Sequence, residues 1–320
     1  MSRMDDLAVV MVTWNVRDWA LRALRSLFVA LERSALTASV WVVDNASSDG
    51  TVEAIRSTFP AVHVIANSTN RGFAAANNQA LRAMGFPDRP AAPRYVWLLN
   101  PDTEVLDEAP RILLRFMEST PRAGVCGPRL IYPDGRFQHS AFDFPGLAQL
   151  FLDLFPLHPR LLETRLNGRY PRAWYMRGKP FRIGHPLGAA MMVRGEAIRS
   201  VGLLDEGYWI YAEEVDWCWR MARAGWERYC VPEAVVVHAG GESARQVRPD
   251  MIRALWASRL RLYRRHYPRW KLRAACRLVA LGAGARARAL ARAVDPESAA
   301  LRAAYEAVKH MALQMENLQD

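Results

Sequence analysis

The sequence has no apolar run of about 18 residues, the length that a helix needs to cross a membrane. It also has few cysteines, and none of the four shows CxxC spacing: Cys126, Cys218, Cys230 and Cys276. This spacing excludes the usual zinc motifs and a disulfide framework, so we expect reduced thiols inside the fold. No Gly-x-Gly-x-x-Gly motif follows a predicted strand, which disfavours a classical dinucleotide fold.

A secretory leader is also missing from the first residues, because Asp5 and Asp6 precede an apolar run that is too short. We therefore expect a cytoplasmic chain. Residues 251–294 contain no Asp or Glu but twelve Lys or Arg, whereas the other 276 residues carry 31 Lys or Arg against 32 Asp or Glu. The net charge of +11 therefore belongs to one segment, and any anionic partner should bind there.

Globular composition is what remains: 51% of the 320 residues are apolar and 23% are charged. Buried strands are predicted at residues 7–13, 40–43, 62–66, 95–99, 125–132, 187–193, 228–231 and 234–237. Helices are predicted at residues 18–31, 51–58, 74–84, 107–119, 196–201, 213–224 and 297–318. This alternation predicts an α/β fold with a mainly parallel sheet flanked by helices. We expect a catalytic domain over residues 1–245 and a basic, amphipathic helical region over residues 246–320.

Residues 133–186 are rich in Pro, Gly, aromatics and Arg and show little periodicity, which is typical of functional loops. Within them, residues 146–157 form a short apolar stretch. It is either a core or lid helix or a lipid-facing surface.

Polar residues follow four of the predicted strands. They are Thr13-Trp14-Asn15, Asp44-Asn45, Asn100-Pro101-Asp102 and His238. Ligands of open α/β sheets bind at the carboxyl ends of the strands, so these clusters are candidate binding residues. Each cluster alone is equally typical of a helix cap or turn. Glu213, Glu214 and Asp216 place three carboxylates at the start of a predicted helix, where the helix dipole favours them even without a catalytic role.

The chain resembles the family 2 inverting glycosyltransferases, which have the GT-A nucleotide-sugar fold, and within them the rhamnosyltransferase-like members. The matching stretches run in order over about residues 7–243. They are VVMVTWN, VWVVDNASSDGT, NRGFAAANNQAL, WLLNPDT, PLGAAMMVRGEAI, VGLLDEGYWIYAEEVDWCWRMARAGW and VVVHAGGES.

The resemblance implies a set of residues around a nucleotide-sugar donor. The nucleoside would be bordered by Thr13, Asn15, Asp44, Arg71, Gly72 and Asn78. Asp44 could accept a hydrogen bond from the N3–H of uracil or thymine, or from the ribose. Gly188 and Ala189 would pass near the diphosphate and sugar, where a large side chain would obstruct the donor.

The resemblance also implies a divalent metal, Mg²⁺ or Mn²⁺, that neutralises the diphosphate leaving group. Asp102 is the candidate ligand, and His238 would add an imidazole, which suits Mn²⁺ better. Family members usually have Asp-x-Asp where this chain has Asn100-Pro101-Asp102. Asn100 could contact the ribose or a metal-bound water but supplies no charge.

Glu214 aligns with the family's catalytic base, which is usually an Asp. In an inverting transfer this carboxylate takes the proton of the acceptor hydroxyl as the oxygen attacks the anomeric carbon. Clustered carboxylates raise one another's pKa, which helps a base to work near neutral pH. Asp216 would hold the acceptor or position the helix. Trp209 and Tyr211 could stack on an acceptor sugar, or be core residues.

Arginines alternate with aromatic and aliphatic residues in the basic segment, which predicts binding to an anionic membrane surface. Trp256, Tyr263, Tyr267 and Trp270 would bury in the lipid interface. The alternatives are nucleic-acid binding and a solvated helix face. The last predicted helix would pack on the domain or on a second subunit, giving a homo-oligomer.

These features together predict a metal-dependent inverting glycosyltransferase, peripheral at the inner face of the plasma membrane. It would move a hexose, L-rhamnose, from a dTDP- or UDP-sugar to a hydroxyl of a lipid-linked (polyprenyl) or surface-glycan acceptor, and would bind no nucleic acid. The alternative is a nucleic-acid-binding protein with a nucleotide-binding domain and a basic tail. A nucleotidyltransferase is disfavoured because residues 14–18 contain no glycine.

Overall fold

The computed structural model describes residues 6–89, 92–155, 158–240, 248–292 and 295–317. Its sheet is built on β1 (Leu7–Thr13), whose seven residues are all buried, as expected for a strand covered on both faces. Parallel strands flank it, so that β3, β2, β1 and β4 are neighbours in that order. The bounds are Ser39–Asp44 for β2, His63–Ala66 for β3 and Tyr95–Leu99 for β4.

The second half of the sheet is mixed. β11 (Ala190–Arg194) is antiparallel to both β4 and β6 (Ala123–Ile131), and β12 (Glu227–His238) is parallel to β6. The edge is completed by β5 (Thr103–Val105), with β7 (Phe137–Gln138) on β6 and β9 (Phe181–Arg182) on β12. β12 is one strand with a register shift between Val231 and Val235, where the sequence predicted two short strands.

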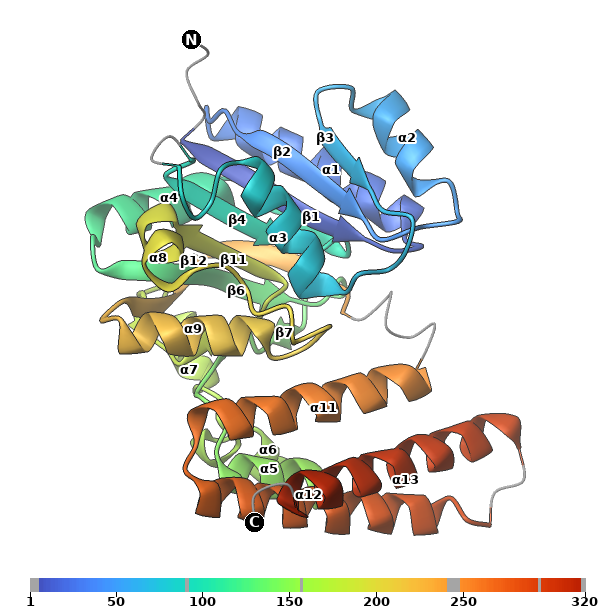
Figure 1. The fold of residues 1–320 in the computed structure, drawn as a ribbon. Coiled ribbons are helices and arrows are strands. Elements are labelled where there is room, and N and C mark those ends of the chain that lie inside the picture. Colours follow the sequence, from blue (N-terminus) through green and yellow to red (C-terminus); the bar gives the residue numbers. More distant parts are fainter. Residues whose placement is uncertain (1–5, 90–91, 156–157, 241–247, 293–294, 318–320) are drawn as a thin grey trace.

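Helices cover both faces of this sheet (Figure 1). One face carries α1 (Arg17–Arg33), α2 (Thr51–Thr58) and α4 (Ala109–Ser119). The other carries α3 (Phe73–Ala83), α8 (Gly195–Val201) and α9 (Glu213–Arg223). Apolar side chains at helical spacing on each helix, such as Leu24 and Leu27 of α1, face the sheet and are buried. The predicted α/β sheet flanked by helices is confirmed.

The segment of residues 133–186 contains short elements rather than only loops. They are β8 (Ala141–Phe142), α5 (Leu147–Leu154), α6 (Pro159–Leu162), the 3₁₀ turn Arg165–Asn167, α7 (Arg172–Met176) and β10 (His185–Pro186). Leu150 and Leu154 of α5 are buried against the C-terminal helices. This apolar stretch is therefore a core helix; residues 156–157 of the predicted stretch lie outside the described residues.

The C-terminal region is a bundle of α11 (Arg248–His266), α12 (Arg269–Ala289) and α13 (Pro296–Asn317). In Figure 1, α11 lies between the sheet domain and the other two helices. Ala304, Val308 and Ala312 bury α13 within the bundle. The predicted boundary at 245/246 falls outside the described residues.

Two predicted membrane anchors are wrong. Trp256 and Tyr263 are 4% and 2% exposed and pack inside the bundle, while Tyr267 is half-buried. Both side chains lie on the face of α11 that packs against the neighbouring helices, and the sequence alone could not show that these helices cover that face. Trp270, on α12, is exposed. Among the described residues, no helix combines the length and the hydropathy required to span a membrane.

Candidate active site

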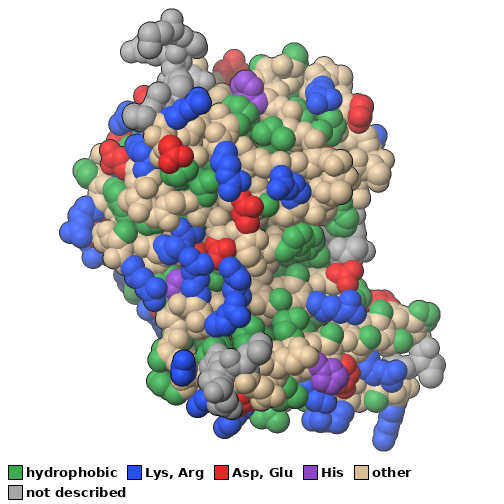
Figure 2. Space-filling model, viewed as in Figure 1, with side chains coloured by type: hydrophobic (Ala, Val, Ile, Leu, Met, Phe, Trp, Pro, Cys, Tyr) green, Lys and Arg blue, Asp and Glu red, His purple; other side chains and the backbone are tan. Residues whose placement is uncertain are grey.

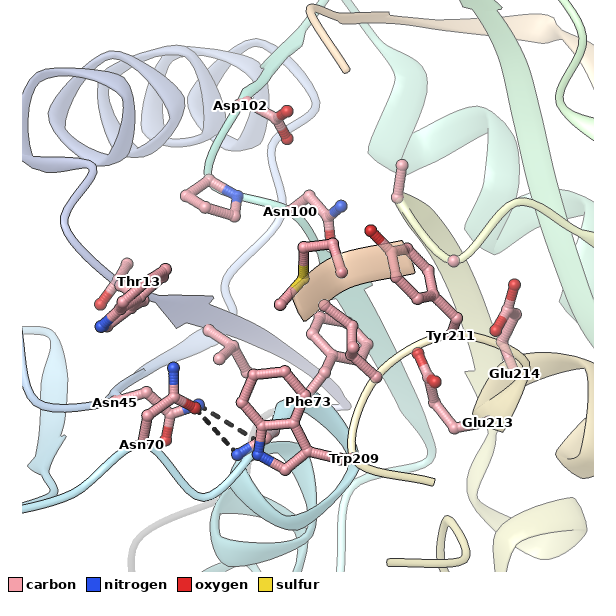
Figure 3. Close-up of a pocket in the computed structure, with 18 of the residues that line it drawn as sticks. Thr13, Asn45, Asn70, Phe73, Asn100, Asp102, Trp209, Tyr211, Glu213 and Glu214 are labelled. Carbon is pink, nitrogen blue, oxygen red and sulfur yellow. Dashed lines mark hydrogen bonds between the residues drawn. The ribbon is translucent and has the colours of Figure 1, made fainter. Parts of the chain in front are cut away.

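A pocket lies at the carboxyl ends of β1, β2 and β4, where the sequence places its polar clusters (Figure 3). Eight of the predicted residues line it: Thr13, Gly72, Asn100, Asp102, Gly188, Ala189, Glu214 and His238. They come from strands and loops far apart in the sequence. The fold therefore brings the predicted donor, metal and base residues around one cavity.

The floor of the pocket is a buried hydrogen-bond cluster between β1 and β2. Thr13 Oγ1 donates to Asp44 Oδ1 at 2.7 Å, and Ser47 donates to both oxygens of the same carboxylate. Asp44 is only 1% exposed and lies beneath Thr13 rather than in the pocket lining. Asn45 reaches the cavity instead, held by the bond from its Nδ2 to the Gly72 carbonyl.

The loop that precedes α3 contacts the loop that precedes α9 at Gly72 and Trp209, and only a glycine fits at position 72. Its φ is +83°, and an added Cβ would lie 2.4 Å from Trp209 Cδ1 and from the Trp209 carbonyl oxygen. The Phe73 amide donates to that carbonyl at 2.6 Å. Trp209, 40% exposed, thus closes one side of the pocket directly against the glycine backbone.

Asp102 and His238 form the candidate metal centre. His238 Nε2 lies 3.5 Å from Asp102 Oδ1, and His238 Nδ1 lies 3.1 Å from Gln138 Oε1. The pair places one imidazole nitrogen and one carboxylate side by side, and Gln138 contacts the other ring nitrogen. Imidazole with carboxylate suits Mn²⁺. Among the described residues, no group of three or more His, Cys, Asp or Glu side chains is arranged so that it could hold a metal ion.

The base motif begins α9 on the opposite side of the pocket from Thr13 and Asn45 (Figure 3). Glu213 is buried and its Oε2 has no hydrogen-bond partner among the described residues. Burial raises the pKa of Glu213 well above its usual value, with a further rise from the Glu214 charge. Burial raises the pKa of Glu214 to about 7. Glu214 therefore titrates near neutral pH, where a general base works well.

Gly188 lies directly against the base. A Cβ at this position would be 3.5 Å from Glu214 Cγ, in ordinary contact. A larger side chain would displace the Glu214 carboxylate, so the small residue keeps the base free to face the pocket.

The structure places five predicted residues outside the pocket lining: Asn15, Asp44, Arg71, Asn78 and Asp216. Asn15 braces the turn after β2, since its Oδ1 accepts from the Ser48 amide at 2.8 Å. Asn78 is fully buried and bonds to the Leu204 backbone in both directions.

Asp216 is also fully buried and does not line the pocket. Its carboxylate accepts from His266 Nε2 at 2.7 Å and from Arg220 Nε at 2.8 Å. Burial would raise the pKa of Asp216, but these bonds and the charges of Arg220 and Arg265 hold it below its usual value. Of its two predicted roles, this placement agrees with positioning the helix.

The pocket lining includes Asn45, which the strand-end clusters of the sequence had indicated. Sequence reasoning missed other lining residues: Asn70, Phe73, Leu187 and Met251. Asn70 lies inside a recognised motif, so its proximity to Gly72 could have indicated it. Met251 gave no such indication, because it lies on α11, in the segment predicted to be a separate tail.

The chain is similar to characterised glycosyltransferases. The model of the family "Glycosyl transferase family 2" matches residues 8–194. The N-acetylglucosaminyl-diphospho-decaprenol L-rhamnosyltransferase of Mycobacterium tuberculosis is 33% identical over 240 residues, which are 73% of this chain and 76% of that protein. The dTDP-rhamnosyl transferase RfbF of Shigella flexneri is 23% identical over 241 residues, 75% of this chain and 71% of that one.

Solved structures share the fold. The mannosyltransferase PcManGT of Pyrobaculum calidifontis, in complex with GDP-Man and Mn²⁺, aligns with a TM-score of 0.54 and 17% identity. The alignment covers 98% of this chain and 88% of that one. GalNAc-T7 with UDP, GalNAc and Mn²⁺ aligns with a TM-score of 0.53 over 78% of this chain and 48% of that one, also at 17% identity. The fold is GT-A, and this chain belongs to glycosyl transferase family 2 as a rhamnosyltransferase-like glycosyltransferase.

Proposed function

We propose that the chain is a metal-dependent inverting hexosyltransferase. It transfers L-rhamnose from a dTDP- or UDP-sugar to a hydroxyl of a lipid-linked or surface-glycan acceptor. The observation that carries the proposal is the position of Glu214: it lines the same pocket as Asp102 and His238 and lies on the opposite side of it from Thr13 and Asn45 (Figure 3). A binding module does not require such a base, and the names of the two rhamnosyl-transferring relatives support the sugar.

The residues divide between donor and acceptor. Asn45 and Asn70 offer amide groups to the nucleoside, while the fully buried Thr13, whose hydroxyl donates to Asp44, supports this side of the pocket. Tyr211 borders the other side, near Glu213 and Glu214, and Trp209 lies against Gly72 beside Asn70 (Figure 3); the aromatic faces of both suit an acceptor sugar. The acceptor oxygen attacks the anomeric carbon and its proton passes to the Glu214 carboxylate. The bond from that carbon to the diphosphate breaks, and attack from the opposite side inverts the configuration.

Asp102 and His238 would hold a divalent cation, whose charge neutralises the diphosphate that leaves. Gln138 would keep the His238 ring oriented, as partners behind a metal ligand commonly do.

Asp102→Asn should weaken nucleoside diphosphate binding when Mn²⁺ is present and leave it unchanged without metal. Titration calorimetry measures both affinities, and full transfer activity in excess EDTA would contradict the metal proposal.

The proposed acceptor is carried by a membrane, since the Mycobacterium tuberculosis relative is named for a diphospho-decaprenol substrate. We place the membrane-binding surface on α12 and the chain at the inner face of the plasma membrane. Trp270 and Leu281 of this helix are 65% and 63% exposed, and Arg277 and Arg288 lie on the same side at helical spacing. Basic and apolar side chains on one helix face suit an anionic lipid surface.

A donor panel tests the proposed reaction. Purified protein is incubated with Mn²⁺ and UDP-, dTDP- or GDP-sugars, with and without a polyprenyl-diphosphate-linked acceptor, and released nucleoside diphosphate is measured. We expect turnover with dTDP- or UDP-rhamnose that depends on the acceptor and disappears in Glu214→Gln. Turnover with GDP-sugars alone would overturn the donor assignment. The product anomer, read by NMR, tests inversion.

A further inference from the structure

The loop that enters the base helix has a backbone that needs support from its surroundings. Tyr211 and Ala212 have φ of +69° and +64°, in the left-handed region that non-glycine residues seldom adopt. Such residues persist where neighbouring structure holds them, and they concentrate at functional sites. This loop, residues 205–212, supplies Trp209, Ile210 and Tyr211 to the pocket and then leads into Glu213 and Glu214.

Helix α11 holds this loop at both ends. Ser258 Oγ donates to the Ile210 carbonyl at 2.7 Å, one residue before the left-handed pair. At the other end, Arg261 Nη2 donates to both oxygens of Asp205, at 3.1 and 2.9 Å, and Arg265 pairs with the same carboxylate. Between these points, Leu262 is fully buried in a small apolar cluster with Tyr208, Ala212 and Val215.

The same helix also holds α9. His266 Nε2 lies 2.7 Å from Asp216 Oδ1, with both side chains fully buried, and Arg265 Nε lies 3.0 Å from the same oxygen. The His266 ring stacks on Trp219 with centroids 4.7 Å apart and planes 16° from parallel. Asp216 follows Glu214 by two residues in the first turn of α9. A shift of Asp216 therefore moves the base.

We propose that α11 is a positioning element of the active site. It fixes the left-handed Tyr211–Ala212 backbone through Ser258 and Arg261 and the register of the base helix through His266, so that Tyr211 and Glu214 face the pocket together. Ser258, Arg261 and His266 are positioning residues, since they act through the loop and through Asp216. The inference rests on the proposed function, in which Glu214 is the base.

The arrangement predicts which side chains matter. The Val308 side chain of α13 is fully buried, as the His266 side chain is, but it contacts the bundle core rather than the loop or α9. Its loss should lower stability without disturbing the pocket. Loss of the Ser258 hydroxyl removes one hydrogen bond and little volume, so it should disturb the pocket with little effect on stability. The two variants separate positioning from folding.

The experiment compares Ser258→Ala, His266→Ala and His266→Gln with Val308→Ala, all in the full chain. Steady-state transfer gives kcat and the KM of donor and acceptor, and thermal unfolding gives Tm. We expect kcat to fall about 10- to 100-fold in His266→Ala and several-fold in Ser258→Ala, with the donor KM unchanged. His266→Gln, which keeps an N–H donor near Asp216, should recover part of kcat. Val308→Ala should lower Tm and keep kcat.

Hydrogen exchange supplies a readout that needs no activity. Peptides covering residues 205–216 should exchange faster in Ser258→Ala and His266→Gln than in the unmodified protein, while peptides covering 39–44 should not change. If Ser258→Ala and His266→Gln fold and show the same kcat and the same exchange rates as the unmodified protein, the positioning role is overturned. The positioning role is also overturned if Val308→Ala loses as much kcat as Ser258→Ala and His266→Ala do. Absence of transfer by the unmodified protein over the whole donor panel would instead contradict the proposed function, and the exchange result would still decide the positioning of the loop.

Discussion

Helices α11 and α12 share one composition, rich in Arg with aromatic and aliphatic residues and without acids from residue 251 onward, yet their charges face different surroundings. On α11, Arg259 pairs with Asp153 at 2.8 Å and Arg261 with Asp205 at 2.9 Å. Arg265 reaches Asp205 and Asp216. The acids lie in the preceding part of the chain, so these arginines fasten the bundle to the catalytic domain.

The outer face of α12 differs. Of the basic residues of α12, Arg277 pairs with Glu316 of α13 at 2.7 Å, whereas no acidic side chain among the described residues pairs with Arg269, Lys271 or Arg288. Figure 2 shows Lys and Arg side chains both where the bundle meets the sheet domain and around the outer edge of the bundle. A run of positive charge in a sequence therefore does not define one function, because the position of its counter-charges decides whether it is structural or free to bind a partner.

The largest expected effect is the loss of kcat when the base itself is removed, and no variant of α11 should lower kcat by more. Glu214→Gln keeps the shape of the base but cannot accept a proton, so kcat should fall by about 10²–10⁴-fold. Because Glu214 works as the carboxylate and burial raises its pKa to about 7, the unmodified enzyme should lose kcat as pH falls below about 7. The Gln variant should lack this acid limb. Steady-state rates from pH 5.5 to 9 measure both, and an unchanged kcat would leave Glu214 without a catalytic role.

Charge reversal tests the contrast between the helices directly. Arg261→Glu places a carboxylate beside Asp205 and removes two charge-assisted hydrogen bonds, so it should cost about 2–3 kcal/mol of unfolding free energy and lower kcat. Arg288→Glu, on the exposed face, should change unfolding free energy by no more than about 0.5 kcal/mol and leave kcat intact. Urea unfolding and transfer assays with a short soluble acceptor measure the pair. Equal stability of the two variants would contradict separate roles.

Much of the fold and half of the site could be predicted, because their causes are local. The apolar run of β1 and the polar residues that follow it belong to one short stretch, and the strand-end rule then gathers Thr13, Asn100 and His238 at one edge. Glu214 was recognisable because its neighbours in the sequence form the family motif. The position of β11 between β4 and β6, antiparallel to both, could not be predicted in this way, because strand pairing depends on contacts between residues that are distant in the sequence.

The contacts of α11 could not be predicted because they join distant residues. His266 meets Asp216 across 50 positions and Ser258 meets Ile210 across 48. Amphipathic spacing on α11 showed that one side would be buried but could not distinguish a lipid surface from a protein one. Trp256 therefore gave a wrong prediction, whereas Trp270, with the same local pattern, lies exposed.

Membrane binding should show a smaller effect, confined to α12. Each Arg near an anionic lipid surface contributes about 1 kcal/mol, or roughly a fivefold change in affinity. Arg288→Glu should therefore weaken co-sedimentation with phosphatidylserine-containing vesicles by at least that factor. Binding should also require anionic lipid and weaken as salt rises from 50 to 300 mM, since screening acts within about 8 Å at physiological salt. Equal binding to neutral and anionic vesicles would contradict an electrostatic surface.

The smallest expected effect belongs to Trp270. Its ring is 65% exposed, so insertion into the lipid interface would remove apolar surface from water without any change in charge. Trp270→Ala should therefore weaken vesicle binding only a few-fold, by the same factor at low and high salt, unlike Arg288→Glu, whose effect should shrink as salt rises. Trp174 on α7 is also partly exposed, at 36%, and Trp174→Ala is the matched control that should leave vesicle binding unchanged. If Trp174→Ala releases the protein as well as Trp270→Ala does, the bound surface extends beyond α12 and the contrast between the helices is weaker than stated.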